Sequence, residues 1–287
     1  MPLRIPTPFL DLEATLEGGQ AFRWRCVDGA WEGVIGDRWV RLRQEGGDLL
    51  AETATDPGDG VWLRHYLGLD EDLEAIVRTF PDDPPLRDAV RACPGLRLLR
   101  QDPWECLASF ILSSTKQIVQ IQQCVALLCD AFGEPLPGPT GATSPRAFPT
   151  ADRLALVTES QLRACKLGFR ARYLAAAAQA VAAGRLDLDS LRALSTPAAR
   201  ERLTELPGVG PKIANCVLLF AYGRQDAFPV DVWVLRALRE LYFPRRRPKA
   251  RTLQRFTETH FGPNAGYAQQ YLFHYIRNHR PTETRLS

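Results

Sequence analysis

A Gly-rich turn between two helical segments constrains this chain more than any other feature. Residues 203–223 read LTELPGVGPKIANCVLLFAYG, so one helix is predicted to end at Leu206 and a second to begin at about Pro211. Gly208 and Gly210 are expected to supply positive φ and to remove side chains from the turn. Backbone amides at the start of the second helix can then approach an anion closely.

The sequence L-P-G-V-G-P-K around this turn is typical of a helix-hairpin-helix DNA-binding motif. Amides of Gly208, Val209 and Gly210 would bind the phosphates of a duplex without reading its bases. A plain αα-hairpin with a Gly-rich turn is the alternative.

Lys212 lies in the first turn of the second helix, where a cation opposes the helix dipole. Lysine is rare in this chain, since only four of the 36 basic residues are Lys. A lysine placed against the helix dipole therefore indicates a catalytic role, because an amine can serve as a nucleophile. The alternative is a lysine that contacts phosphate.

Asp231 follows Pro229 and precedes an apolar run, which predicts an N-cap. Beside Lys212, its carboxylate could also stabilise a developing cation and help to deprotonate the amine.

Charge is unevenly distributed along the chain. Residues 236–287 hold 11 basic and 3 acidic residues (+8), whereas the whole chain carries +3, so the first 235 residues carry −5. A basic C-terminal part is compatible with a polyanionic partner or with a solvated face, and the run PRRRPKAR at 244–251 leaves both interpretations open.

The chain also lacks an apolar stretch that resembles a signal peptide or a membrane span. We therefore expect an intracellular, soluble protein.

The pattern predicts an α+β fold with a small antiparallel sheet domain at 1–100 and a mostly helical domain at 101–287. Strands are expected between about 18 and 50, with turns at Asp28-Gly29 and Gly36-Asp37, and the first helix at 69–80. Asp102 and Pro103 predict the start of another helix. A Pro- and Gly-rich loop at 134–147 marks an internal boundary. Further helices are expected near 117–132, 151–157, 159–165, 170–183, 187–193, 196–205, 211–222, 232–242, 249–260 and 264–279.

Taken together, the hairpin, Lys212 and PVDV resemble the helix-hairpin-helix DNA glycosylases, and within them the 8-oxoguanine DNA glycosylase family. The resemblance extends over nearly the whole chain and includes GGQAFRWR (18–25), LLRQDPWECLASFILSS (98–114), LGFRARY (167–173), LPGVGPKIANC (206–216), PVDV (229–232) and GYAQQYLF (266–273). It implies excision of 8-oxoguanine from duplex DNA in base excision repair, with Lys212 as the nucleophile. A Schiff base then permits strand cleavage by β-elimination, and Asp231 stabilises the charge on the sugar.

The resemblance also assigns a base-binding set. A flipped nucleotide would be held by Gly19, Cys216, Pro229, Gln269 and Phe273. A carbonyl at Gly19 can accept from the N7–H that 8-oxoguanine has and guanine lacks. Phe273 offers a stacking face and Gln269 can donate and accept at the Watson–Crick edge. For Phe273, core packing is the alternative.

Five DNA-facing positions complete the comparison with the family pattern. Thr115 and Gln120 stand where that pattern has an Asn-rich run and an Arg. Arg170 keeps a cytosine-contacting Arg, Phe169 replaces a wedge Tyr, and Trp233 replaces a His. Loss of one bidentate Arg contact predicts a weaker preference for cytosine opposite the lesion, by about 1–3 kcal/mol.

We expect no cofactor, because the seven Cys form no CxxC pair and none follows Cys216, which argues against both a zinc site and an iron–sulfur cluster. The expected partner is damaged duplex DNA, bound by a monomer. Two other functions stay open: a glycosylase for alkylated or mispaired bases, and a non-catalytic DNA-binding protein.

Overall fold

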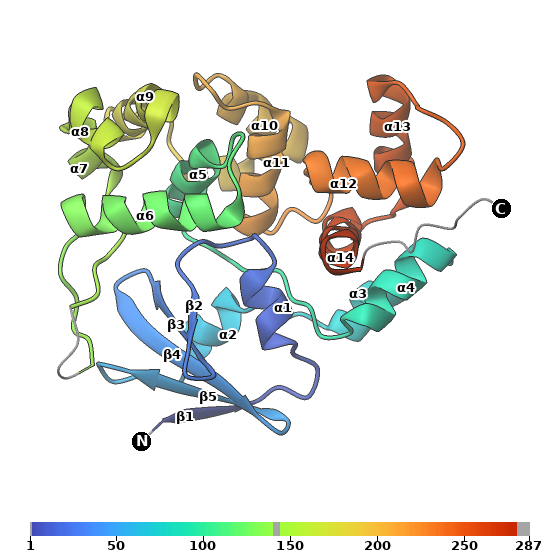
Figure 1. The fold of residues 1–287 in the computed structure, drawn as a ribbon, viewed down its shortest axis with the longest axis horizontal. Coiled ribbons are helices and arrows are strands. Elements are labelled where there is room, and N and C mark those ends of the chain that lie inside the picture. The colour runs from blue at the N-terminus through green and yellow to red at the C-terminus, as the bar shows by residue number, and fades with distance from the viewer. Residues whose placement is uncertain (1, 140–143, 280–287) are drawn as a thin grey trace.

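An antiparallel sheet packs beneath a helical body in the computed structural model, which describes residues 2–139 and 144–279 (Figure 1). The five strands lie in the order β1-β5-β4-β3-β2. Their bounds are β1 Leu3–Pro6, β2 Arg25–Val27, β3 Ala30–Ile35, β4 Arg38–Glu45 and β5 Asp48–Thr53. The β2–β3 turn is formed by Asp28 (φ 49°) and Gly29 (φ 73°), as a two-residue hairpin requires. Gly36 (φ 59°) and Asp37 form the β3–β4 turn between the paired residues Ile35 and Arg38, so both predicted hairpin turns are confirmed.

One face of the sheet is buried by alternating apolar residues. Val40, Leu42 and Leu49 are fully buried, in agreement with the period of two in a strand. Trp24 covers Gly33, where a Cβ would lie 2.6 Å from the indole ring, and its Nε1 donates to the hydroxyl of Tyr66 at 2.9 Å. Tyr66 ends helix α2 (Val61–Tyr66), so this helix is held against the sheet.

The N-terminal part holds four elements that sequence periodicity missed. These are β1, α2, α1 (Leu12–Glu17) and α4 (Pro84–Ala92). The predicted helix at 69–80 is present as α3 (Leu73–Arg78), which begins after the N-cap Asp72.

The remainder of the described chain is helical, as predicted, and the α+β class is confirmed. Asp102 caps α5 and Pro103 is its first residue, also as predicted. The expected helix at 187–193 is only a 3-10 turn, and part of the 134–147 loop pairs through Pro135 and Arg146, while 140–143 lie outside the described residues. The bounds are α5 Pro103–Leu112, α6 Ile118–Phe132, α7 Ala151–Ala155, α8 Glu159–Ala164, η1 Gly168–Arg170, α9 Ala171–Ala182, η2 Ser190–Ala193, α10 Thr196–Thr204, α11 Pro211–Phe220, α12 Val232–Ala237, η3 Leu238–Tyr242, α13 Ala250–His260 and α14 Ala265–Asn278.

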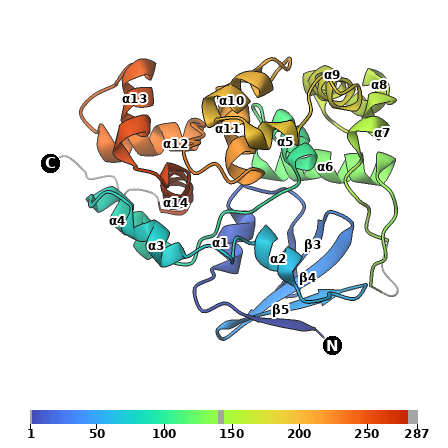
Figure 2. The same ribbon diagram turned by 180° about the vertical axis from the view of Figure 1, so that it is seen from behind.

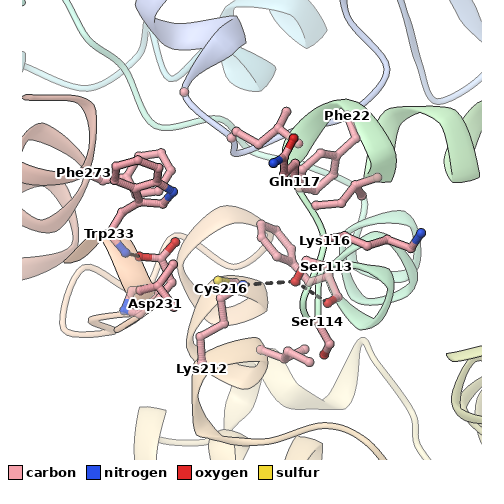
Figure 3. A pocket seen from close by; sticks show the side chains of 18 of the residues that line it. Phe22, Ser113, Ser114, Lys116, Gln117, Lys212, Cys216, Asp231, Trp233 and Phe273 are labelled. Carbon is pink, nitrogen blue, oxygen red and sulfur yellow. Dashed lines mark hydrogen bonds between the residues drawn. The ribbon is translucent and has the colours of Figure 1, made fainter. Parts of the chain in front are cut away.

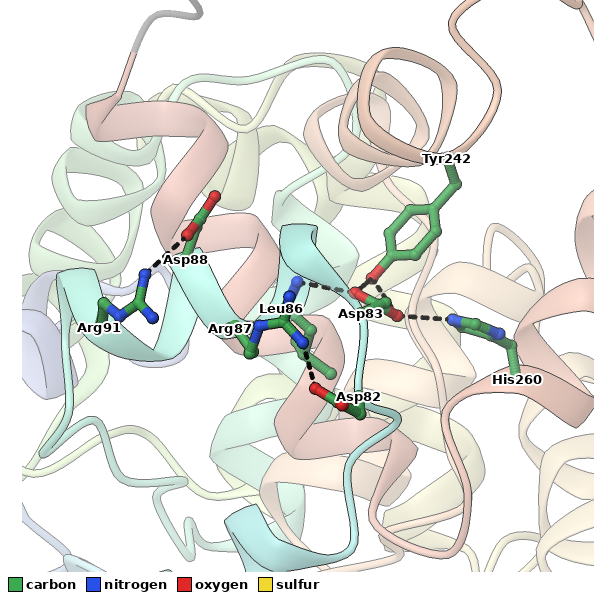
Figure 4. A network of polar contacts seen from close by, with 8 residues as sticks. All are labelled: Asp82, Asp83, Leu86, Arg87, Asp88, Arg91, Tyr242 and His260. Carbon is green, nitrogen blue, oxygen red and sulfur yellow. Dashed lines mark hydrogen bonds and ion pairs between the residues drawn. The ribbon is translucent and has the colours of Figure 1, made fainter.

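Helices α3 and α4 lie beside α14, which is distant in sequence (Figures 1 and 2). Asp83 caps α4 and accepts hydrogen bonds from the hydroxyl of Tyr242 at 3.1 Å and from Nε2 of His260 at 2.7 Å (Figure 4). This network ties an N-terminal helix to the C-terminal helices. The proposed domain division at 100/101 stays a prediction.

Candidate active site

A cavity of about 700 Å³ opens where the loop at Gly19 meets the helical body. Its walls come from that loop, the segment after α5, helix α11, the residues before α12, and helix α14 (Figure 3). Eight predicted site residues line it: Gly19, Thr115, Lys212, Cys216, Pro229, Asp231, Gln269 and Phe273. The other six predicted residues are not among its lining residues: Gln120, Phe169, Arg170, Gly208, Val209 and Gly210. The tertiary structure thus gathers segments separated by more than 250 positions in sequence.

Lys212 is half-buried in the first turn of α11, where its amine meets a hydroxyl group. Its Nζ donates to Oγ of Ser113 at 3.1 Å and lies 5.1 Å from the centre of the Phe110 ring. Oγ of Ser113 donates in turn to the carbonyl of Phe110 at 2.7 Å. No carboxylate within the described ranges lies within 4.0 Å of this amine. The sequence analysis did not single out Ser113, although Ser113 and Ser114 end the segment 98–114 on which the family resemblance rests.

Asp231 is the N-cap of α12, as predicted. Its Oδ1 accepts hydrogen bonds from the backbone amides of Trp233 at 2.9 Å and Val234 at 2.8 Å. Two amides therefore orient the carboxyl group, and Oδ2 has no hydrogen bond to any described residue. An oxygen that is free of helix contacts on a cavity-lining carboxylate can face a developing positive charge.

Helix α14 and the loop at Gly19 form the opposite wall. Gln269 is 3 % exposed and its Oε1 has no partner among the described residues. Phe273 lies one helical turn further on. Gly19 has φ 69°, and a Cβ there would lie 3.3 Å from the Phe273 ring and 3.0 Å from Ile118. The positive φ favours glycine, and the close approach leaves little room for a Cβ. The unpaired amide oxygen of Gln269 indicates a ligand with a hydrogen-bond donor.

Cys216 is a neutral thiol near neutral pH. Burial raises its pKa to about 11, and the charge of Lys212 only partly opposes this shift. Its contribution to the cavity is therefore a small, polarisable apolar surface.

The segment after α5 is held by Arg170. Its Nε donates to the carbonyl of Ser114 at 2.7 Å and its Nη2 to Oγ1 of Thr115 at 2.6 Å. Thr115 has φ 56°, an uncommon conformation for a β-branched residue. Arg170 is buried, which lowers its pKa, and its guanidinium lies 4.3 Å from the exposed ring of Phe169. In this structure its donors are thus used within the protein.

Gln120 closes a capping box at the start of α6. Its Oε1 accepts from the backbone amide of Gln117 at 3.0 Å. The side chain thus stabilises the helix start immediately after the segment that Arg170 holds.

The hairpin turn requires glycine at one of its two positions for a conformational reason. Gly208 has φ 82°, and a Cβ there would lie 2.4 Å from the ring of Tyr173. The expectation of positive φ at Gly210 is wrong, because Gly210 has φ −98° and ψ 179° as the N-cap of α11. A Cβ on Gly210 would meet no described residue within 4 Å, so no contact with this part of the chain explains the missing side chain. Val209 between them is buried.

Residues 2–139 and 144–279 contain no group of three or more potential metal ligands. None of their helices has the length and apolar character to cross a membrane.

Comparison with known proteins places the two parts of the chain in known families. Residues 2–107 match "8-oxoguanine DNA glycosylase, N-terminal domain" and residues 108–263 match "HhH-GPD superfamily base excision DNA repair protein". The N-glycosylase/DNA lyase OGG1 of Arabidopsis thaliana is 34 % identical over 95 % of this chain and 79 % of its own length.

Two solved structures share the fold. MBOgg1 in complex with a low-affinity DNA ligand has a TM-score of 0.91 and 36 % identity, and covers 96 % of this chain and 95 % of its own. Clostridium acetobutylicum 8-oxoguanine glycosylase/lyase, bound to duplex DNA with cytosine opposite 8-oxoguanine, has a TM-score of 0.89 and 31 % identity, covering 96 % and 97 %. The similarity therefore spans both the sheet and the helical body.

Proposed function

The chain belongs to the 8-oxoguanine DNA glycosylase family, the bifunctional N-glycosylase/DNA lyases of base excision repair, and from this premise we propose the roles of its site residues. The observation that carries the proposal is the amine of Lys212, which lines the cavity beside Asp231 and is held by the hydroxyl of Ser113. A base in the middle of a duplex cannot reach this amine, so the damaged nucleotide must leave the stack.

In the proposed mechanism Lys212 is the nucleophile. Its uncharged Nζ attacks C1′ of the sugar, the N–C1′ bond to the base breaks, and the base departs with the bonding electrons and takes up a proton. The covalent amine loses a proton and opens the sugar ring to a Schiff base. Removal of a proton from C2′ then expels the 3′ phosphate and cleaves the strand. Asp231 stabilises the positive charge that develops on the sugar before the new bond is complete.

The cavity wall opposite Lys212 discriminates the lesion. The carbonyl of Gly19 accepts the N7–H of 8-oxoguanine, whereas guanine presents a lone pair there. Phe273 stacks on the base, and Cys216 and Pro229 add apolar contacts to it. Gln269 forms hydrogen bonds with the Watson–Crick edge of the base. The unpaired, buried Oε1 of Gln269 supports this assignment.

Apart from Thr115, the residues proposed to bind the duplex lie outside the cavity lining. The amides of Gly208, Val209 and Gly210 bind phosphates, and the open space beside Gly210 supports their close approach. The exposed Phe169 fills the vacated stack, while Thr115, Gln120 and Arg170 face the orphaned base. A monomer suffices for one lesion, and we propose that the protein acts as a soluble, DNA-associated monomer.

Borohydride trapping tests the nucleophile. The protein is incubated with a duplex that contains 8-oxoguanine opposite cytosine, and reduction should yield a covalent complex. Lys212→Gln should abolish the complex, whereas Lys116→Gln, the other lysine that lines the cavity, should retain it. An undamaged duplex should give no complex.

Each other outcome contradicts a defined part of the proposal. Release of free base without trapping would mean that water attacks with the help of Asp231. Binding without base release would mean that the substrate is an alkylated or mispaired base, or that the protein only binds DNA.

A further inference from the structure

Arg277 is a cavity residue to which the mechanism above gives no role. It lies on α14 one turn beyond Phe273 and two turns beyond Gln269, and all three residues line the cavity. Its guanidinium carbon lies 5.2 Å from the centre of the Phe273 ring. The same helix face thus presents an amide, an aromatic ring and a cation in order.

The guanidinium of Arg277 has unused hydrogen-bonding capacity. Its one hydrogen bond within the described residues runs from Nη1 to the carbonyl of Glu17, at 3.4 Å. Two other partly buried arginines are paired, Arg23 with Glu105 and Arg100 with Glu71, but no described carboxylate lies within 4.0 Å of Arg277.

The surroundings of Arg277 are costly for an unpaired charge. The side chain is half-buried, and burial lowers its pKa, while the more distant charges of Asp231 and Glu17 oppose that shift. A half-buried guanidinium with up to four idle N–H donors gains stability when an anion binds. Because this position is at the cavity, the anion would come from the ligand.

The spacing along α14 indicates which part of the ligand lies there. Eight residues separate Gln269 from Arg277, about 12 Å along a helix. That span is comparable with the reach from the Watson–Crick edge of a purine to its own phosphate. If Gln269 meets the edge of the base and Phe273 its face, as proposed above, Arg277 lies where the DNA backbone re-enters the stack. Guanidinium groups match phosphate oxygens in a bidentate manner.

We propose that Arg277 binds a phosphodiester that flanks the flipped nucleotide and so anchors that nucleotide in the cavity. The proposal rests on the proposed function, because it takes the ligand to be a flipped nucleotide. Trp233, the neighbour of Asp231 at the cavity, has no charge to offer a phosphate, and Arg277 supplies one from the adjacent wall. Arg277 is thus a binding and positioning residue.

A phosphate-neutralising substitution tests this contact directly. Binding is measured by fluorescence anisotropy in the Lys212→Gln background, with lesion duplexes that carry either ordinary phosphates or a single methylphosphonate 5′ or 3′ of the lesion. On the ordinary duplex, Arg277→Met should weaken binding about tenfold and reduce the salt-dependence slope by about one. Arg277→Lys should recover part of the loss. On one methylphosphonate duplex, Arg277→Met should have no further effect.

The controls separate this proposal from its premise. Arg87→Met removes an equal charge from α4, at a residue that is not part of the cavity lining, and should leave lesion binding unchanged. If Arg277→Met weakens binding equally on all duplexes, Arg277 only braces the carbonyl of Glu17, and the proposal is overturned. Unchanged binding by Arg277→Met would also overturn it. Failure of the unsubstituted protein to prefer lesion over undamaged duplex, or to be trapped by borohydride, would instead contradict the proposed function.

Discussion

Nζ of Lys212 and Oγ of Ser113 lie 3.1 Å apart, although 99 residues separate them in sequence. Because the Ser113 hydroxyl donates its hydrogen bond to the carbonyl of Phe110, its oxygen can only accept a hydrogen bond from the lysine. When the amine is uncharged, this hydrogen bond restricts the orientation of its single lone pair. We therefore propose that Ser113 is a positioning residue for Lys212, the proposed nucleophile.

We predict that Ser113→Ala slows single-turnover base excision about fivefold, the loss of roughly 1 kcal/mol of one hydrogen bond. Substrate affinity should change less than the rate, because the serine acts on the amine. The matched control is Ser114→Ala, whose neighbouring hydroxyl makes no hydrogen bond to described residues while its carbonyl still accepts from Arg170. Equal rates for Ser113→Ala and the unsubstituted protein would contradict the prediction.

Gly19→Ala should damage both stability and activity. An alanine at φ 69° costs about 1–2 kcal/mol, and its Cβ would also crowd Phe273 and Ile118. Gly29→Ala has a similar φ of 73° but open space around it, so it should lose stability alone. Denaturant unfolding and excision rates of both variants check this. If Gly29→Ala lost as much activity as Gly19→Ala, the local packing argument would be wrong.

A weak preference for cytosine opposite the lesion is expected. Gln120 has no guanidinium and caps α6, and donors of Arg170 are already hydrogen-bonded to Ser114 and Thr115, so we expect these side chains to give the orphaned base few hydrogen bonds. The loss should be about 1–3 kcal/mol of discrimination. Excision rates opposite each of the four bases measure it, and Gln120→Arg should raise the preference for cytosine. A strong cytosine preference in the unsubstituted protein would exclude this explanation.

Stability should fall as pH rises above 9. Burial raises the pKa of Cys93 and of Cys129 to about 12, from an ordinary value of 9.0. A folded-state pKa above the unfolded value means that the stabilisation is complete below pH 9 and is lost as pH rises toward 12. Between pH 9 and 10 the thiols titrate ahead of the tyrosines, which ordinarily ionise at 10.0, so the effect of a single thiol is measured by comparing variants in this range. Cys93→Ala should flatten this slope, and Cys26→Ala, at an exposed site, should not.

Short elements show where local sequence signals were insufficient. Strand β1 and helices α1 and α2 have four to six residues each, too few for a periodic pattern, and β1 exists because it pairs with β5. Helix α4, by contrast, does carry a local start signal, Asp83 followed by Pro84, and was therefore predictable from the sequence. The longer helices and the Asp-Gly hairpin were predictable because their signals are local.

In the candidate site, too, some residues were predictable from local sequence and others only from the tertiary structure. Sequence alone singled out Lys212 through its conflict with the dipole of α11, and Asp231 as the N-cap of α12, since both arguments depend on a few adjacent residues. Only the tertiary structure decided that Ser113 holds the lysine, that Arg170 fixes the segment beside it, and that Arg277 reaches the cavity without a carboxylate partner among the described residues. These contacts join residues far apart in the chain, and side-chain hydrogen bonds and burial arise from packing, which no local pattern encodes.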